Sequence, residues 1–193
     1  MKMPNNYEQT KIGGDYIPIS LGGHHLIIKK VEETQSKTGK PMLKVFFDTS
    51  KADSQPEFFA NEFRNDIRPD KKWPRNGTAY ILIEDNDGNC SRNFKRFMTS
   101  FEHSNNCESV WGDKFAAQFK DKRIGGIFGE VENEYNGKVS MRHELRWFCS
   151  DDKADSASVP DPKLLSGSTS TTSNTSSDGF MDIPDGAQEE LPF

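Results

Sequence analysis

The composition of the chain changes sharply after Cys149, and this change limits how much of the chain can form a packed core. Residues 166–177 are mostly serine and threonine, without a large apolar side chain. Such a run behaves as a flexible linker. The apolar share of the whole chain, 33%, is correspondingly low for a globular protein. We therefore expect an N-terminal arm over 1–21, one folded domain over 22–149 and a disordered, acidic linker over 150–188.

The charge of the chain divides at the same point. Residues 150–193 carry nine acidic residues and two lysines, a formal charge of −7, whereas residues 1–149 carry 21 acidic and 23 basic residues, a formal charge of +2. The whole-chain charge of −5 hides this difference. A mildly basic domain joined to an acidic tail suggests a polyanionic ligand for the domain and another task for the tail.

Apolar periodicity before Cys149 predicts five short strands and a helix. Strands are expected over 24–34, 42–49 and 78–84, the last buried on both faces, and over two segments of 123–148 that Asn136-Gly137 divides as a hairpin turn. A helix beginning near Ser91 is expected to bury one stripe of side chains, and a second short helix is expected from Asp113. The stripe consists of Phe94, Phe97, Met98 and Phe101.

Five strands with a helix between the third and fourth match the OB-fold, a partly open barrel that binds oligonucleotides on its second and third strands and on two of its loops. Another small α+β barrel or a sandwich would fit the same order of elements. In an OB-type barrel, the first hairpin and the second strand meet the nucleic acid. The residues expected to bind there are Lys37, Lys40, Lys44 and Phe46, while Leu43, Val45 and Phe47 face the core.

Two further basic groups are candidates for nucleic-acid binding, because single strands are held by positive grooves and aromatic faces. The connection between the second and third strands supplies Arg64, Arg68, Lys71, Lys72, Trp73 and Arg75, although a surface loop with Trp73 tucked under it is the competing interpretation. The fifth strand supplies Lys138, Arg142 and Arg146 on one face, which a merely solvated strand would also show. Its opposite face is expected in the core: Val139, Met141, His143, Leu145 and Trp147.

The acidic tail ends in Glu189-Glu190-Leu191-Pro192-Phe193, preceded by Met181-Asp182-Ile183-Pro184-Asp185 and the serine-threonine linker. This ending resembles the carboxy-terminal tail of bacterial and bacteriophage single-stranded DNA-binding proteins. In that family, the acidic tip docks replication, recombination and repair enzymes. The resemblance implies a phage-type protein that coats single-stranded DNA and recruits such enzymes. Stacking and phosphate contacts would serve RNA as well, and one barrel per chain is compatible with a homo-oligomer. The implied docking residues are Asp182, Asp185, Glu189, Glu190, Leu191, Pro192 and Phe193.

Two other functions stay open. Glu130, Glu132 and Glu134 share a strand face and could serve a metal-dependent nuclease, although no nucleophile or phosphate-binding motif accompanies them. Alternatively, the chain is an interaction protein that binds no DNA and imitates a docking tail. We expect no enzyme activity and no cofactor. The polar start, the absence of a membrane-length apolar stretch and three cysteines without C-x-x-C spacing predict a cytoplasmic protein.

Overall fold

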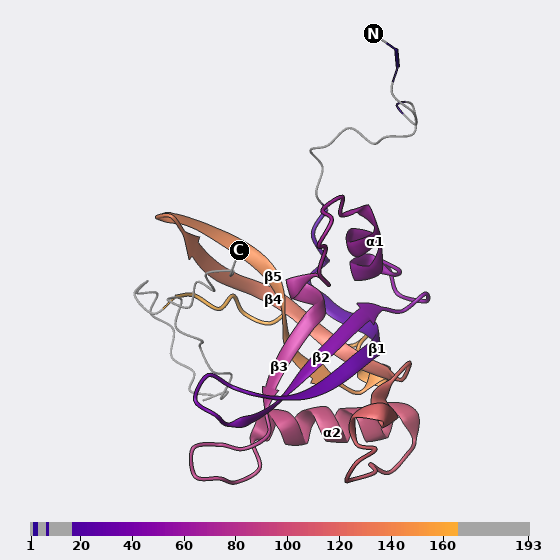
Figure 1. Cartoon of the computed structure of the whole chain (residues 1–193), viewed down its shortest axis with the longest axis vertical. Helices are drawn as coiled ribbons and strands as arrows, with labels where there is room; N and C mark the ends of the chain where they lie inside the picture. The colour runs from indigo at the N-terminus through magenta and orange to yellow at the C-terminus, as the bar shows by residue number, and fades with distance from the viewer. Residues whose placement is uncertain (1, 4–6, 8–16, 166–193) are drawn as a thin grey trace.

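A five-stranded antiparallel sheet and two α-helices make up the fold in the computed structural model, which describes residues 2, 3, 7 and 17–165 (Figure 1). The strand order across the sheet is β3-β2-β1-β4-β5. In chain order the elements are β1 (Gly22–Gln35), β2 (Pro41–Thr49), α1 (Phe58–Asn65), β3 (Thr78–Leu82), α2 (Arg92–Asn105), β4 (Arg123–Tyr135) and β5 (Lys138–Cys149). The mainly β fold with a helix between the third and fourth strands, predicted from the sequence, is confirmed.

The sheet is curled, and its two edge strands approach each other. Asn76, in a 3-10 turn over Arg75–Gly77 just before β3, donates a hydrogen bond from Nδ2 to the carbonyl oxygen of His143 on β5, at 3.4 Å. α1 and α2 lie at opposite ends of the sheet, and the β4–β5 hairpin extends well beyond it (Figure 1). The hairpin turns at Asn136 and Gly137, whose positive φ angles of 51° and 71° are those of a type I′ turn.

The predicted helix after Ser91 is present as α2. The Ser91 hydroxyl accepts a hydrogen bond from the Phe94 amide at 3.1 Å, which caps the helix. Its predicted apolar stripe is buried, and Phe97 packs edge-to-face on Phe148 of β5 with ring centroids 5.1 Å apart. The second predicted helix forms only a short 3-10 turn over Ala116–Phe119.

The core lies on the inner face of the curled sheet. Leu43, Val45 and Phe47 of β2 are fully buried, as their alternation predicted. Phe47 makes edge-to-face contacts with Phe59 of α1 and with Phe148 of β5. One aromatic cluster therefore joins α1, the centre of the sheet and its far edge.

The sequence did not predict α1, because the group that caps this helix comes from β2, ten or more residues earlier in the chain. Oδ1 of Asp48, on β2, accepts hydrogen bonds from the backbone amides of Phe59 and Ala60 at 2.9 and 3.3 Å. Asp48 is fully buried, and this burial raises the pKa of its carboxyl above the ordinary value. Lys29 lies 3.9 Å from Oδ2, which accepts no hydrogen bond from a described residue. The helix thus depends on a long-range contact.

Two expectations about strand faces are wrong. β3 is not buried on both faces, since Tyr80 is 43% exposed between the buried Ala79 and Ile81. Between β4 and β5, the register shifts between Ile127 and Phe128, and a β-bulge places Arg146 between the pairs Ile127–Trp147 and Phe128–Leu145. The extra residue puts Trp147 and Leu145 on opposite faces, so Leu145 packs against the core as expected whereas Trp147 does not. Val139 and Met141 lie in the part of the hairpin that extends beyond β1. Phe148 is buried, Trp147 is partly exposed, and Val139 and Met141 are 59% and 41% exposed.

The packed part of the chain extends past Cys149 into the segment assigned to the linker. Ala154 is buried against Gly23 of β1, where a Cβ atom would lie 1.9 Å from the Ala154 carbonyl oxygen. The backbone of Lys163 exchanges hydrogen bonds with Glu130 and Glu132 along the edge of β4, at 2.9 and 2.8 Å. Because these contacts involve main-chain atoms, the polar composition of the segment did not reveal them.

Candidate nucleic-acid interface

The outer face of β2 and β3 brings a lysine between two aromatic rings. Lys44 pairs with Tyr80 across the two strands, and Phe46 lies two residues along β2 on the same face. The Lys44 ammonium is 5.0 Å from the ring centroid of Phe46 and 5.6 Å from that of Tyr80. Both distances are within the range of a cation–π contact. We call Lys44, Phe46 and Tyr80 the β2–β3 face.

This face has a rigid base and an accessible surface. Leu43 and Val45, which alternate with its residues on β2, are fully buried, so the backbone beneath is fixed by the core. Tyr80 is 43% exposed, while Lys44 and Phe46 are half-buried. Neither helix lies over the middle of β2 and β3 (Figure 1). Exposed ring faces next to an ammonium group can stack bases and neutralise a phosphate.

β1 adds one more cation beside this face, together with an acid. Lys30 is the partner of Phe46 across β1 and β2, and Glu32 is the partner of Lys44. The Lys30 ammonium lies 2.6 Å from a Glu32 carboxylate oxygen. An exposed ion pair of this kind contributes little to stability, so a phosphate can replace Glu32 as the partner of Lys30 at small cost.

Of the two lysines predicted in the first hairpin, Lys37 is exposed at the turn, and Lys40 is engaged with a neighbouring loop. The Lys40 ammonium donates hydrogen bonds to Oδ1 of Asn86 at 2.5 Å and to the carbonyl oxygen of Asp85 at 3.3 Å. The two loops are thereby joined at one end of β2 and β3. Lys37 remains the more accessible of the two cations.

The aromatic residue predicted to stack in the connection after β2, Trp73, is instead half-buried and packs against the core. Its indole N–H donates to the carbonyl oxygen of Gly77 at 3.0 Å, and Phe63 lies 5.8 Å away. Lys71 lies over the Phe63 ring at 4.9 Å. The geometry thus favours the competing interpretation for Trp73. Lys71, Lys72 and Arg75 of this connection are exposed.

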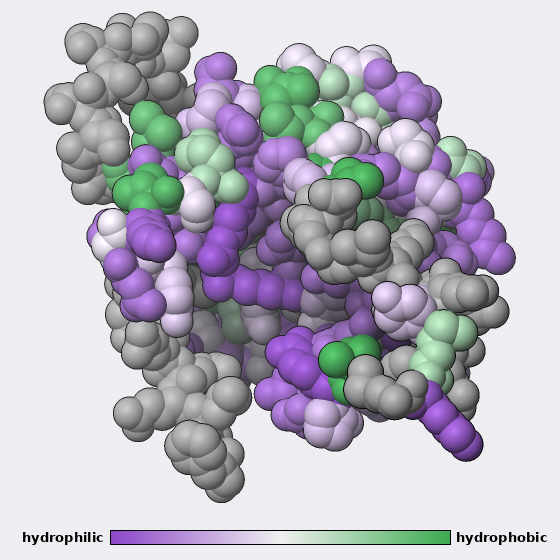
Figure 2. Space-filling model, turned by 90° about the horizontal axis from the view of Figure 1, so that it is seen from above, coloured by the Kyte–Doolittle hydropathy of each residue, from purple (hydrophilic) through white to green (hydrophobic). Residues whose placement is uncertain are grey.

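Arg64 and Arg68, which are exposed as well, have acidic partners nearby. Arg64 contacts Glu57 at 3.2 Å, and Arg68 contacts Asp66 at 2.7 Å. Hydrogen bonds from Arg68 lower the pKa of Asp66 to about 2, so this pair stays ionised throughout the neutral range. Hydrophilic residues dominate the described surface at this end of the molecule (Figure 2). These arginines can bind phosphate only in competition with their partners.

The basic residues of β5 do not act as one row. Lys138 and Arg142 share a face of the hairpin, opposite Tyr135 and Val131. Arg146 lies in the bulge, where its Nη1 donates to the carbonyl oxygens of Glu130 and Asp161 at 3.3 and 3.0 Å. Arg146 therefore joins the segment after β5 to β4. Lys138 and Arg142 are far better placed to meet a ligand.

Sequence reasoning missed Tyr80, the most exposed ring of the β2–β3 face. The nearly continuous apolar run over 78–84 suggested burial on both sides. The available signal was the residue type, since the phenol of a tyrosine needs a polar surrounding. Placing Tyr80 opposite Lys44 also required the register between β2 and β3, which depends on contacts between distant parts of the chain.

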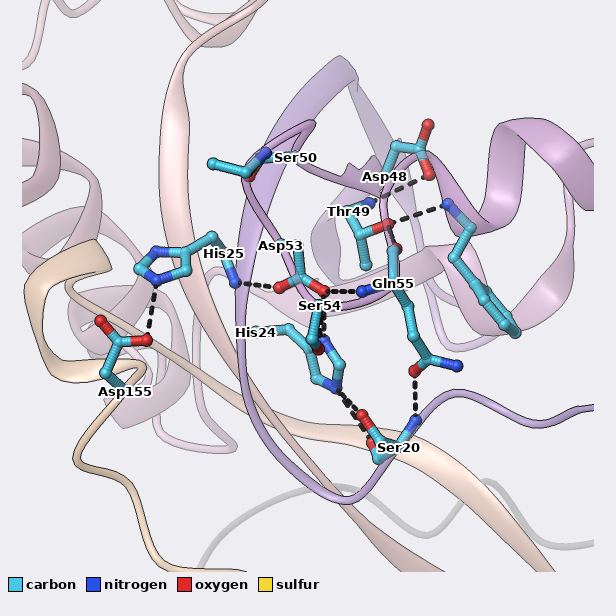
Figure 3. Close-up of polar contacts among 12 residues, drawn as sticks. Ser20, His24, His25, Asp48, Thr49, Ser50, Asp53, Ser54, Gln55 and Asp155 are labelled. Atoms are coloured by element: carbon cyan, nitrogen blue, oxygen red, sulfur yellow. Dashed lines mark hydrogen bonds and ion pairs between the residues drawn. The ribbon is translucent and has the colours of Figure 1, made fainter.

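A second polar cluster lies near the start of β1, where Ser20, His24 and Asp53 meet (Figure 3). The Ser20 hydroxyl is 3.0 Å from His24 Nε2, and Asp53 Oδ1 is 2.9 Å from His24 Nδ1. Burial raises the pKa of Asp53, but His24 and the backbone amides of Gln55 and His25 outweigh this effect and lower it overall.

The order Ser–His–Asp is that of a nucleophilic triad, but two observations favour a structural role. His24 is only 1% exposed, which keeps a substrate from its ring, and its Nε2 also lies 3.0 Å from the backbone oxygen of Ser20. We interpret the cluster as a link that fastens the segment before β1 to the turn after β2.

The glutamates considered for metal-dependent cleavage lie along β4. Within the described residues, His, Cys, Asp and Glu side chains form no group of three or more that could hold a metal ion. Glu132 accepts a hydrogen bond from the Leu165 amide at 2.9 Å.

None of the helices within residues 17–165 has the length and apolar character needed to cross a membrane.

The predicted docking residues, from Asp182 to Phe193, lie outside the described part of the chain. No protein-family model matches the sequence, and no curated protein matches it.

Proposed function

We propose that this protein binds single-stranded DNA with little sequence selectivity and that the strand lies across the β2–β3 face. The observation that carries the proposal is the position of Lys44 between the rings of Phe46 and Tyr80. Two rings accept stacked bases of any sequence, and the ammonium between them neutralises phosphate. Lys37, at the turn between β1 and β2, and Lys138 and Arg142, on the β4–β5 hairpin, extend this surface.

The topology supports an OB-like barrel as the scaffold of this function. The strand order β3-β2-β1-β4-β5, the contact of Asn76 with His143 between the two edges, and α2 between β3 and β4 are compatible with that fold. OB-folds bind oligonucleotides on the outer surface of strands two and three and on the adjoining loops. In the OB-like barrel that we propose, the β2–β3 face is the corresponding surface.

The second part of the proposed function belongs to the tail. The acidic residues before Leu191, Pro192 and Phe193 resemble the docking tip of bacterial and phage single-stranded DNA-binding proteins. We propose that this segment recruits replication, recombination or repair proteins in the cytoplasm of a bacterial host. The protein itself then performs no catalysis and holds DNA for the recruited enzymes.

Fluorescence anisotropy with a labelled oligo-dT and with a duplex of equal length tests the binding proposal. We expect tight binding to the single strand, weaker binding to the duplex, and a fall in log K of about 0.7 for each phosphate contact per decade of salt. Binding to neither probe would favour the interaction protein that imitates a docking tail.

The nuclease alternative is tested on the same labelled oligonucleotide. The protein is incubated with it in the presence of magnesium or manganese, and the products are separated by size. We expect the oligonucleotide to remain intact. Cleavage that disappears in Glu132→Ala would overturn the proposed function.

A further inference from the structure

A tryptophan on the loop between α2 and β4 is exposed although it belongs to an aromatic cluster. Trp111 is 65% exposed. Its ring stacks on Phe115 with centroids 5.2 Å apart and an angle of 19°, and Phe94 lies 6.3 Å away. Phe94 and Phe115 are each only 6% exposed and belong to the core. The core aromatic cluster therefore reaches the surface at Trp111.

The loop that carries Trp111 is fixed by its own hydrogen bonds. The Gln118 side chain accepts a hydrogen bond from the Val110 amide at 2.7 Å and donates one to the Val110 carbonyl oxygen at 2.9 Å. It thus satisfies both backbone groups of Val110, as the backbone of a neighbouring strand would. The Ser109 amide donates to the Glu102 carboxylate at 3.2 Å. Gly112 has a φ of 93°, which a side chain would strain. Trp111 is thus held in place before any partner arrives, which lowers the entropy cost of binding.

A cavity of about 380 Å³ lies beside this ring. Two of its described lining residues, Glu33 and Asp113, are charged, and both are acidic and exposed. Its remaining described lining is aromatic, aliphatic or glycine: Ile83, Phe94, Trp111, Gly112 and Phe115. The site therefore combines aromatic walls with two carboxylates.

The cavity faces away from the proposed DNA surface. Glu33 pairs with the buried Leu43 across β1 and β2, whereas Lys44 and Phe46 project from the opposite face of β2. Two carboxylates repel phosphate, so the exposed ring of Trp111 is poorly suited to stack a base of a nucleic acid. The same carboxylates attract a cation.

We propose that this cavity binds the side chain of an arginine from a partner protein. A guanidinium group is planar, stacks on an indole ring, and donates several hydrogen bonds to carboxylates. Glu33 and Asp113 supply the charge, and Trp111, which the buried Phe115 supports from behind, supplies the stacking surface. The cavity is then a docking site for a basic segment, separate from the acidic tail and independent of the proposed DNA binding.

The test uses ¹⁵N-labelled full-length protein and two small probes of nearly the same shape, one charged and one neutral. N-acetyl-arginine methylamide is titrated while the indole N–H signal of Trp111 and the amide signals of residues 110–115 are followed. N-acetyl-citrulline methylamide is the neutral control of the same shape. We expect the arginine probe to shift these signals with an affinity about 3- to 30-fold higher than that of citrulline, the range for a cation–π contact strengthened by carboxylates.

Two variants locate the interaction. Trp111→Ala assigns the indole signal by removing it, and it should abolish the shifts of the Gly112 amide while oligo-dT binding stays unchanged. Glu33→Gln combined with Asp113→Asn should lower the preference for arginine over citrulline to that of the cation–π contact with Trp111 alone, about 2- to 5-fold, while the remaining signals keep their positions. Equal shifts with both probes on the unaltered protein would overturn the proposal. The proposal would also be overturned if oligo-dT, and not the arginine probe, shifted the indole signal of Trp111, because the ring would then contact nucleic acid.

Discussion

The replacement of Tyr80 by alanine separates DNA binding from folding more cleanly than other changes on the β2–β3 face. Tyr80 is 43% exposed, and its buried neighbours Ala79 and Ile81 point to the other side of β3, so the core keeps its packing. The fold loses the contact of the ring with Lys44, worth about 0.5–1 kcal/mol at an exposed position. We therefore expect a small change in stability.

The loss of binding should be much larger. A stacked base contributes about 1–3 kcal/mol by alanine substitution, which corresponds to about 5- to 150-fold in Kd. Phe46→Ala should fall in the same range, and the two losses should combine less than additively because Lys44 contacts both rings. The assay is anisotropy of labelled oligo-dT at constant salt, with a thermal melt of each variant.

Trp111→Ala is the matched control, because it removes an exposed ring far from this face and should leave the Kd unchanged. Tyr80→Ala and Phe46→Ala that both bind within twofold of the original protein, at an unchanged melting temperature, would refute the placement of DNA on β2 and β3.

Three other perturbations test the fold and the tail. Asp48→Ala removes the acceptor of the Phe59 and Ala60 amides and should destabilise the protein by about 2–3 kcal/mol in urea unfolding, whereas an unchanged midpoint would show that α1 needs no cap. The hydrogen bond to Asp151 raises the pKa of His25, so the ion pair between the two residues is fully formed below pH 6.5 and is lost as the pH rises through the raised pKa. The amide signals of residues 151–153 should shift with this titration, and the shift should be absent in His25→Gln. Conversion of the five acidic residues after Leu165 to amides should tighten oligo-dT binding severalfold at low salt. The difference in affinity between this variant and the original protein should vanish at high salt, because charges are screened there. Equal affinities at low salt would exclude competition by the tail. These acids are Asp178, Asp182, Asp185, Glu189 and Glu190.

The parts of the fold that depend on neighbouring residues were predictable from the sequence. Asn136-Gly137 specifies a turn that requires positive φ at both residues. The stripe from Phe94 to Phe101 with Ser91 before it specifies both the buried side and the first turn of α2. The alternation in β2 correctly separated the buried Leu43 from the outward-facing Lys44.

The parts that depend on distant contacts were not predictable. α1 takes its cap from Asp48, and the bulge at Arg146 reverses the alternation that placed Trp147 in the core. The main-chain pairing of Lys163 with β4 leaves no side-chain pattern. For the candidate site, the sequence indicated Lys44 and Phe46 only through the expected fold, and the register added Tyr80.

Photo-crosslinking tests the central claim most directly. Oligo-dT with 5-iodo-deoxyuridine at single positions is irradiated with the full-length protein, and the attached residue is identified by mass spectrometry. Because the halogenated base reacts with a ring against which it is stacked, we predict attachment to Tyr80 or Phe46. Attachment to Trp111, or to residues of α1, with Tyr80 and Phe46 unmodified would contradict the binding of single-stranded DNA on the β2–β3 face.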